Sequence, residues 1–129
     1  MAAAFFCSPI AGLYIAQAEE KNRVFEIRTY YANEGKLDAL LARFRDHTVA
    51  LFKKHGMTNV GYWVPTDNKE NKLVYMLAFP SREARNKAFK AFSADPDWQK
   101  ARKESTKDGR LVKKIVNDFL TGTDFSKIK

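Results

Sequence analysis

The chain has 129 residues, of which 45% are hydrophobic and 13% aromatic, which suits one small domain with its own core rather than two domains. A single cysteine excludes a disulfide framework within one chain and any site built on paired cysteines. The formal charge of +8 calls for an anionic partner to be considered, but lysine and arginine are spread along the chain, which favours a solvated basic surface.

The N-terminal segment "MAAAFFCSPIAGLYIAQA" contains no charged residue, whereas the chain from Glu19 onward is dense in charge. It is too short, and too interrupted by proline and glycine, to span a bilayer. It ends in "AQA", a small-x-small pattern that signal peptidases accept, although no basic residue precedes the apolar run. We therefore expect residues 1–18 to be a cleaved secretory signal, residues 19–129 to form a secreted or periplasmic domain, and no stable membrane insertion. A disordered or peripheral N-terminal tail is the alternative.

Four strands and two helical regions are expected in chain order. "VFEIRTYYA" is rich in β-branched and aromatic residues, which indicates a strand, and apolar residues then recur at helical spacing until a glycine that suits a helix end. Two further strands follow, then a helical region that restarts at an Asp-Pro pair, then a last strand. The expected strands are Val24–Ala32, Val60–Pro65, Leu73–Pro80 and Leu111–Leu120, and the helical regions are Lys36–His55 and Arg82–Gly109. This βαββαβ order predicts a ferredoxin-like α+β fold with a four-stranded antiparallel sheet.

The expected strands have apolar residues on both faces. In the third strand Leu73, Tyr75, Leu77 and Phe79 alternate with Val74, Met76 and Ala78. An isolated sheet on two helices would need only one buried face. We therefore expect the face away from the helices to be covered, with a few polar groups inside. A second copy of the sheet would cover it and give a two-fold homodimer around a small cavity.

Several short motifs carry a family resemblance. They are "RTY" at residues 28–30, "HG" at 55–56, "GYW" at 61–63 and "DPDW" at 95–98. With the segments around them, from about Val24 to Leu120, they resemble a NIPSNAP domain. The resemblance implies a dimeric α/β barrel. Relatives in that superfamily include cofactor-free quinol monooxygenases, haem-degrading enzymes and isomerases, so it leaves open whether this chain is an enzyme.

Two residues are the main candidates for chemistry. Arg28 lies in the middle of a central strand, where an arginine must be paired or face a cavity. It either pairs with Glu26 or acts as a clamp for a carboxylate or phenolate. His47 lies on the edge of the apolar helix face, where it could exchange a proton with a ligand or simply bond a backbone carbonyl. For His55, at the helix end, a structural role is expected.

Tyr30, Tyr62 and Trp63 are the expected walls of the cavity. The two histidines are too far apart on one helix to chelate a metal, so we expect no metal site and no tightly bound cofactor, although haem on a single histidine stays open. The third strand lacks the glycine and aromatic register of an RNA-binding domain, so no nucleic-acid partner is expected. The expected partners are a second copy of the chain and a small-molecule ligand.

The functional hypothesis is that the cavity binds a small hydrophobic or aromatic anion. Arg28 would be the clamp and His47 the proton donor or acceptor, and the ligand would be oxidised or isomerised without a bound cofactor. The alternative is a non-enzymatic dimeric binding or scaffold module.

Overall fold

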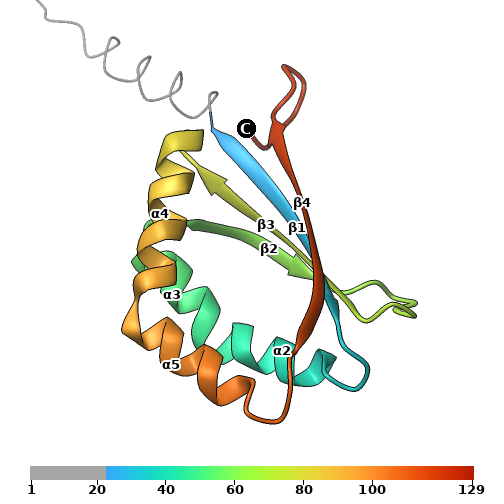
Figure 1. The fold of residues 1–129 in the computed structure, drawn as a ribbon. Helices are drawn as coiled ribbons and strands as arrows, with labels where there is room; N and C mark the ends of the chain where they lie inside the picture. Colours follow the sequence, from blue (N-terminus) through green and yellow to red (C-terminus); the bar gives the residue numbers. More distant parts are fainter. Residues whose placement is uncertain (1–22) are drawn as a thin grey trace, which may run out of the picture.

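The computed structural model describes residues 23–129, so the expected signal segment lies outside the described residues. A four-stranded antiparallel sheet has the strand order β2-β3-β1-β4 (Figure 1). The strands are β1 (Val24–Ala32), β2 (Thr58–Trp63), β3 (Lys72–Phe79) and β4 (Val112–Thr121). The sheet is open within the chain, and its order confirms the ferredoxin-like arrangement expected from the sequence.

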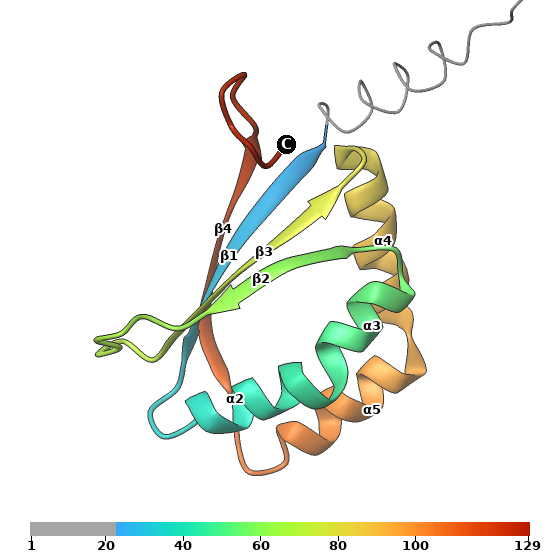
Figure 2. The same ribbon diagram turned by 180° about the vertical axis from the view of Figure 1, so that it is seen from behind.

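The helices lie on one side of the sheet, as both views show (Figures 1 and 2). The first crossover contains α2 (Leu37–Arg43), η1 (Phe44–Thr48) and α3 (Val49–Lys54), and the second contains α4 (Arg82–Ala94) and α5 (Pro96–Ser105). Ser81 caps α4 by accepting a hydrogen bond from the Ala84 amide, as expected for a serine at this position. No helix within residues 23–129 combines the length and the apolar character needed to cross a membrane.

The core lies between the helices and the sheet, and aromatic rings dominate it. Tyr75 on β3 is fully buried at its centre, with its ring 5.1 Å from Phe44 and 5.4 Å from Tyr30. Phe52 and Phe92 extend the cluster between the helices, with ring centres 4.8 Å apart. Burying one such side chain contributes about 1.5–3 kcal/mol, so this layer holds the helices on the sheet.

Strand alternation puts the polar side chains of β1 on the helix side. Tyr30 packs edge-on against Phe44, so Glu26 and Arg28, which alternate with it, face the helices too. These two polar groups of β1 therefore lie on the enclosed helix side, where they pair with each other, whereas Asp118 of β4 lies on the opposite face.

The opposite face of the sheet is mostly apolar, and no helix or strand of the described chain packs across it (Figures 1 and 2). The residues that share this side of the pleat through the strand register are Phe25, Ile27, Thr29, Tyr31, Thr58, Gly61, Trp63, Lys72, Val74, Met76, Ala78, Lys114, Val116, Asp118 and Leu120. Trp63, Val116 and Leu120 are each about 40–55% exposed. We call this set the outer face.

Candidate functional site

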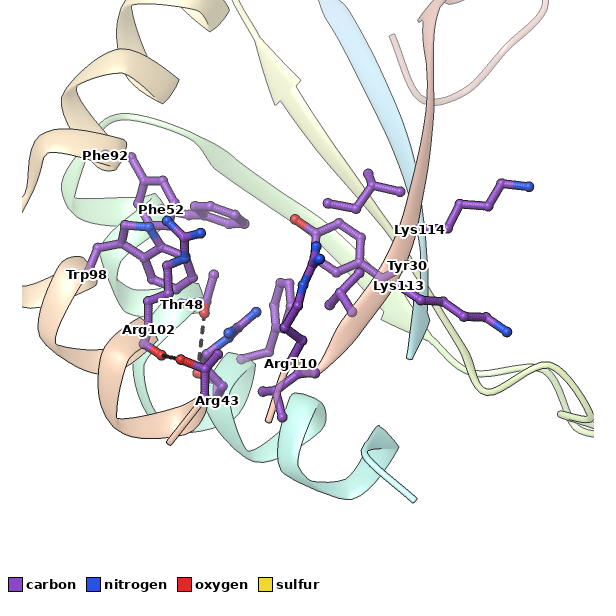
Figure 3. A pocket seen from close by; sticks show the side chains of 15 residues that line it. Tyr30, Arg43, Thr48, Phe52, Phe92, Trp98, Arg102, Arg110, Lys113 and Lys114 are labelled. Atoms are coloured by element: carbon purple, nitrogen blue, oxygen red, sulfur yellow. Dashed lines mark hydrogen bonds between the residues drawn. The ribbon is translucent and has the colours of Figure 1, made fainter. Parts of the chain in front are cut away.

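A cavity of about 600 Å³ lies between the helices and the β1–β4 side of the sheet. Its wall combines aromatic and basic side chains, and none of the described lining residues is acidic. In Figure 3 the guanidinium groups of three arginines turn toward the cavity, whereas Lys113 and Lys114 extend away from it. The aromatic members are Tyr30, Phe44, Phe52, Phe92 and Trp98, and the three arginines are Arg43, Arg102 and Arg110.

Arg43 is the most buried cation of this wall, with 8% of its surface exposed. Its Nη1 donates to Ser105 Oγ at 3.2 Å, and its guanidinium carbon lies 5.1 Å from the centre of the Trp98 ring. Its Nε is buried and has no hydrogen-bond partner among the described residues, and no carboxylate of residues 23–129 pairs with it. Burial lowers the pKa of Arg43, and the nearby positive charge of Arg102 lowers it further.

A π-helical turn, which the sequence analysis did not expect, places Arg43. Residues Phe44–Thr48 form η1, and the Val49 amide donates to the Phe44 carbonyl in the i to i+5 pattern of such a turn. Thr48 therefore lies one wide turn beyond Arg43, and its hydroxyl donates to the Arg43 carbonyl at 3.3 Å. Arg43, Phe44 and Thr48 are all buried at the cavity, in one helix segment.

The same wide turn carries His47 away from the cavity. Each residue of a π-turn rotates by a smaller angle about the helix axis than in an α-helix. The His47 side chain therefore points in a different direction from that of Phe44. His47 is exposed and lies beside Leu51, Ala101 and Glu104 in a shallow surface hollow between the two helical regions. The expectation that His47 approaches the space between helix and sheet is therefore contradicted.

A buried carboxylate, Glu26, organises the sheet side of the site. It is fully buried and accepts hydrogen bonds from Arg28 Nη1 at 2.7 Å, Arg85 Nε at 2.8 Å and Asn117 Nδ2 at 2.9 Å. Burial alone would raise the pKa of Glu26, but the hydrogen bonds from Arg85, Asn117 and Arg28 outweigh it and hold the pKa below its usual value of 4.5. Glu26 is therefore ionised at neutral pH. Arg28 forms an ion pair with it, which is one of the two roles that the sequence predicted for Arg28.

Arg28 does not line the cavity but contacts two phenol groups next to it. Its Nε donates to Tyr75 Oη at 2.8 Å and its Nη2 to Tyr30 Oη at 3.3 Å. The Tyr75 hydroxyl in turn donates to Tyr30 Oη at 3.1 Å. Of these groups only Tyr30 reaches the cavity, so Arg28 acts on the site through Tyr30.

The structure does not bring the five sequence-predicted site residues together. Tyr30 lines the cavity, and Arg28 lies behind it. Tyr62 stacks on Tyr75 at 5.1 Å in the core, donates to Asn59 Oδ1 at 2.6 Å and is not among the lining residues. Trp63 is 54% exposed on the outer face. His47 lies outside, as described above.

The arginines of the cavity were missed by sequence reasoning. Arg43 follows Leu40 by three residues and precedes Phe44, so it lies within the apolar helix face, where a cation is unusual. Arg102 follows Trp98 by four residues, which places both on one side of α5. A charge on an apolar face is the available signal, whereas the spread of basic residues along the chain favours a solvated surface.

Asp95 joins the two helical regions away from the cavity. As the N-cap of α5 it accepts from the Asp97 amide at 2.8 Å, and Lys54 Nζ and His55 Nε2 lie 2.8 and 2.7 Å from its Oδ2. The hydrogen bonds from Lys54, His55 and the Asp97 backbone hold the pKa of Asp95 well below its usual range. His55 thus contacts a structural carboxylate. No cluster of three or more potential metal ligands occurs within the part of the chain that the structure describes.

Comparison with known proteins identifies the family. Residues 25–127 match the NIPSNAP family profile. A NIPSNAP family protein of unknown function from Agrobacterium tumefaciens is 27% identical, with a TM-score of 0.74 over 84% of this chain and 96% of that one. A NIPSNAP-like domain protein from Burkholderia xenovorans is 19% identical, with a TM-score of 0.72 over 82% of this chain and 90% of that one. A putative antibiotic biosynthesis monooxygenase from Nitrosomonas europaea shares the fold at 13% identity, with a TM-score of 0.55 over 77% of this chain and 97% of that one. No curated protein matches. The chain belongs to the NIPSNAP family.

Proposed function

We propose that this protein binds an organic anion with an apolar or aromatic body in the cavity between its helices and its sheet. The observation that carries the proposal is Arg43, a buried guanidinium with no carboxylate partner and an Nε without a hydrogen bond. A buried cation is costly unless an anion compensates it. The described chain supplies no such anion to Arg43, so a bound ligand is the natural source of the negative charge.

The rest of the wall supports the same class of ligand. Arg102 and Arg110 add positive charge at the cavity without any acidic lining residue, and arginine suits oxyanions because its donors form a planar fork. The aromatic residues supply apolar surface for the body of the ligand. A volume of about 600 Å³ lies within the usual range for small-molecule sites. The clamp is therefore Arg43 rather than Arg28, whose three nitrogens each donate a hydrogen bond within the chain.

Native mass spectrometry of the purified protein tests the proposal. Wild type is compared with Arg43→Met, which keeps the apolar stem and removes the charge, and with Arg45→Met, which removes an exposed charge from the same helix. We expect a non-covalent anionic adduct on wild type and on Arg45→Met, and none on Arg43→Met. An adduct that survives in Arg43→Met, or a wild type that carries none and takes up no organic anion on titration, would refute the proposal.

We also propose that two copies of the chain pair through the outer face. Apolar side chains predominate on this face, and on edge strand β4 Val116 and Leu120 are about 40% exposed beside Lys114 and Asp118. A two-fold pairing of identical sheets would bury the face in full.

Oxidation or isomerisation of the ligand stays a prediction, and so does the scaffold alternative. If the dimer binds partners while the cavity is empty, the scaffold alternative is favoured.

A further inference from the structure

The hydrogen bonds of the hydroxyl groups around Arg28 can run in only one direction. Arginine can only donate, so Tyr75 Oη accepts from Arg28 Nε at 2.8 Å and its own proton must go elsewhere. Tyr75 is fully buried, and Tyr30 Oη, 3.1 Å away, is the acceptor the described chain offers. Tyr30 Oη also accepts from Arg28 Nη2 at 3.3 Å.

Tyr30 therefore receives two donors, and its own proton has no acceptor among residues 23–129. Because the ring lines the cavity, that proton is free to meet a ligand there. The three arginines of the same wall cannot accept this proton, because a guanidinium group only donates hydrogen bonds. The chain from Glu26 through Arg28 and Tyr75 thus ends at Tyr30, a cavity-lining residue whose hydroxyl is left as a donor.

We infer that the ligand is an aromatic carboxylate whose two oxygens are held by Arg43 and by the Tyr30 hydroxyl. This inference rests on the proposed anion site and names its substrate class. Two donors from different elements, Arg43 at the end of α2 and Tyr30 on β1, suit the two oxygens of a planar carboxylate. The ring of the ligand lies against the aromatic side chains of the wall.

Tyr30 is then a specificity-determining residue. A site that offers a buried donor rejects ligands without a matching acceptor, because the donor would stay unpaired. Tyr31 is the matched control, since it neighbours Tyr30 on the same strand but points to the outer face. Tyr75→Phe tests the positioning role, because it removes only the hydroxyl that donates to Tyr30.

The experiment measures binding of 2-naphthoate by quenching of Trp98 emission. The chain has two tryptophans, so a Trp63→Phe background leaves Trp98, in the cavity wall, as the only one. We expect 2-naphthoate to bind, and its neutral analogue 2-naphthylmethanol to bind at least about a hundredfold more weakly. Tyr30→Phe should weaken naphthoate binding at least about tenfold, Tyr31→Phe should leave it unchanged, and Tyr75→Phe should fall between Tyr30→Phe and the background protein.

The outcomes separate this inference from the proposed function. If naphthoate binding needs Arg43 but is unchanged in Tyr30→Phe, the anion site stands and the role of Tyr30 is refuted. If the neutral alcohol binds as tightly as the carboxylate, or if 2-naphthoate does not bind while native mass spectra show another anion, the aromatic-carboxylate class is refuted alone. Equal binding by Tyr75→Phe and the background protein refutes the positioning role of Tyr75.

Discussion

Replacing Arg43 with methionine should stabilise the ligand-free protein. An uncompensated buried charge costs roughly 3–5 kcal/mol, as measured when one partner of a buried pair is removed. Arg43→Met removes this cost, and it also loses the hydrogen bond to Ser105 and the contact with the Trp98 ring. These two contacts contribute about 1 kcal/mol each. We therefore expect a net gain of about 1–3 kcal/mol in the free energy of unfolding.

Urea unfolding of ligand-free protein measures this gain, with Arg45→Met as the control for an exposed arginine on the same helix. For a domain of this size, 1 kcal/mol raises the melting temperature by about 4 °C. The reasoning is refuted if Arg43→Met lowers the free energy of unfolding by 2 kcal/mol or more. Such a loss would mean that Arg43 is a structural residue whose charge is already compensated within the chain.

Three further predictions concern the rest of the fold. Glu26→Gln should cost about 3–5 kcal/mol in urea unfolding, because it leaves Arg28 and Arg85 without their carboxylate; a loss below 1 kcal/mol would contradict the buried ion pair. The pKa of Asp95 is depressed in the fold, so its contribution to stability is complete at neutral pH and is lost as the pH falls below its ordinary value of 3.8. Asp95→Asn should therefore flatten the acid limb of a stability–pH profile, and an unchanged limb would contradict this. Met76→Glu, in the middle of the outer face, should convert a dimer into a monomer in light scattering, whereas a wild-type monomer would refute the pairing.

The fold could be predicted from local sequence patterns, because tertiary contacts do not override them. The strand Val24–Ala32 has the bounds that its β-branched and aromatic residues predict, and the Asp-Pro pair at Asp95 starts α5 as a cap and a first helical residue should. The second strand begins earlier than expected, at Thr58, because β2 pairs with β3 through a bulge between Asn59 and Gly61.

The site was less predictable because it depends on one irregular helical turn and on which face of β1 the helices cover. Periodicity assumes a regular helix, so it could not place Arg43 and Thr48 on one side or move His47 outward. Alternation in β1 grouped Arg28 with Tyr30 correctly, but it does not say which face is enclosed. The pairing of Arg28 with Glu26 was foreseen as an alternative, whereas Arg85 and Asn117 come from distant segments that no local pattern connects.

The layer between sheet and helices holds more positive than negative charge, and this imbalance links stability to binding. Arg28 and Arg85 share the single carboxylate of Glu26, and Arg43 adds a charge with no counterpart. An anion that binds only the folded state stabilises it by RT ln(1 + [L]/Kd), which is about 2.7 kcal/mol at a hundredfold excess over Kd.

The order of stability of wild type and Arg43→Met should therefore change with ligand. Without ligand the variant is the more stable by about 1–3 kcal/mol, as argued above. With 2-naphthoate at a hundredfold excess over its wild-type Kd, wild type gains about 2.7 kcal/mol and the variant gains little, so the difference closes or reverses. Melting curves of both proteins at increasing 2-naphthoate measure this directly. Parallel increases in the two melting temperatures would mean that the ligand does not engage Arg43, and would separate the buried charge from the binding site.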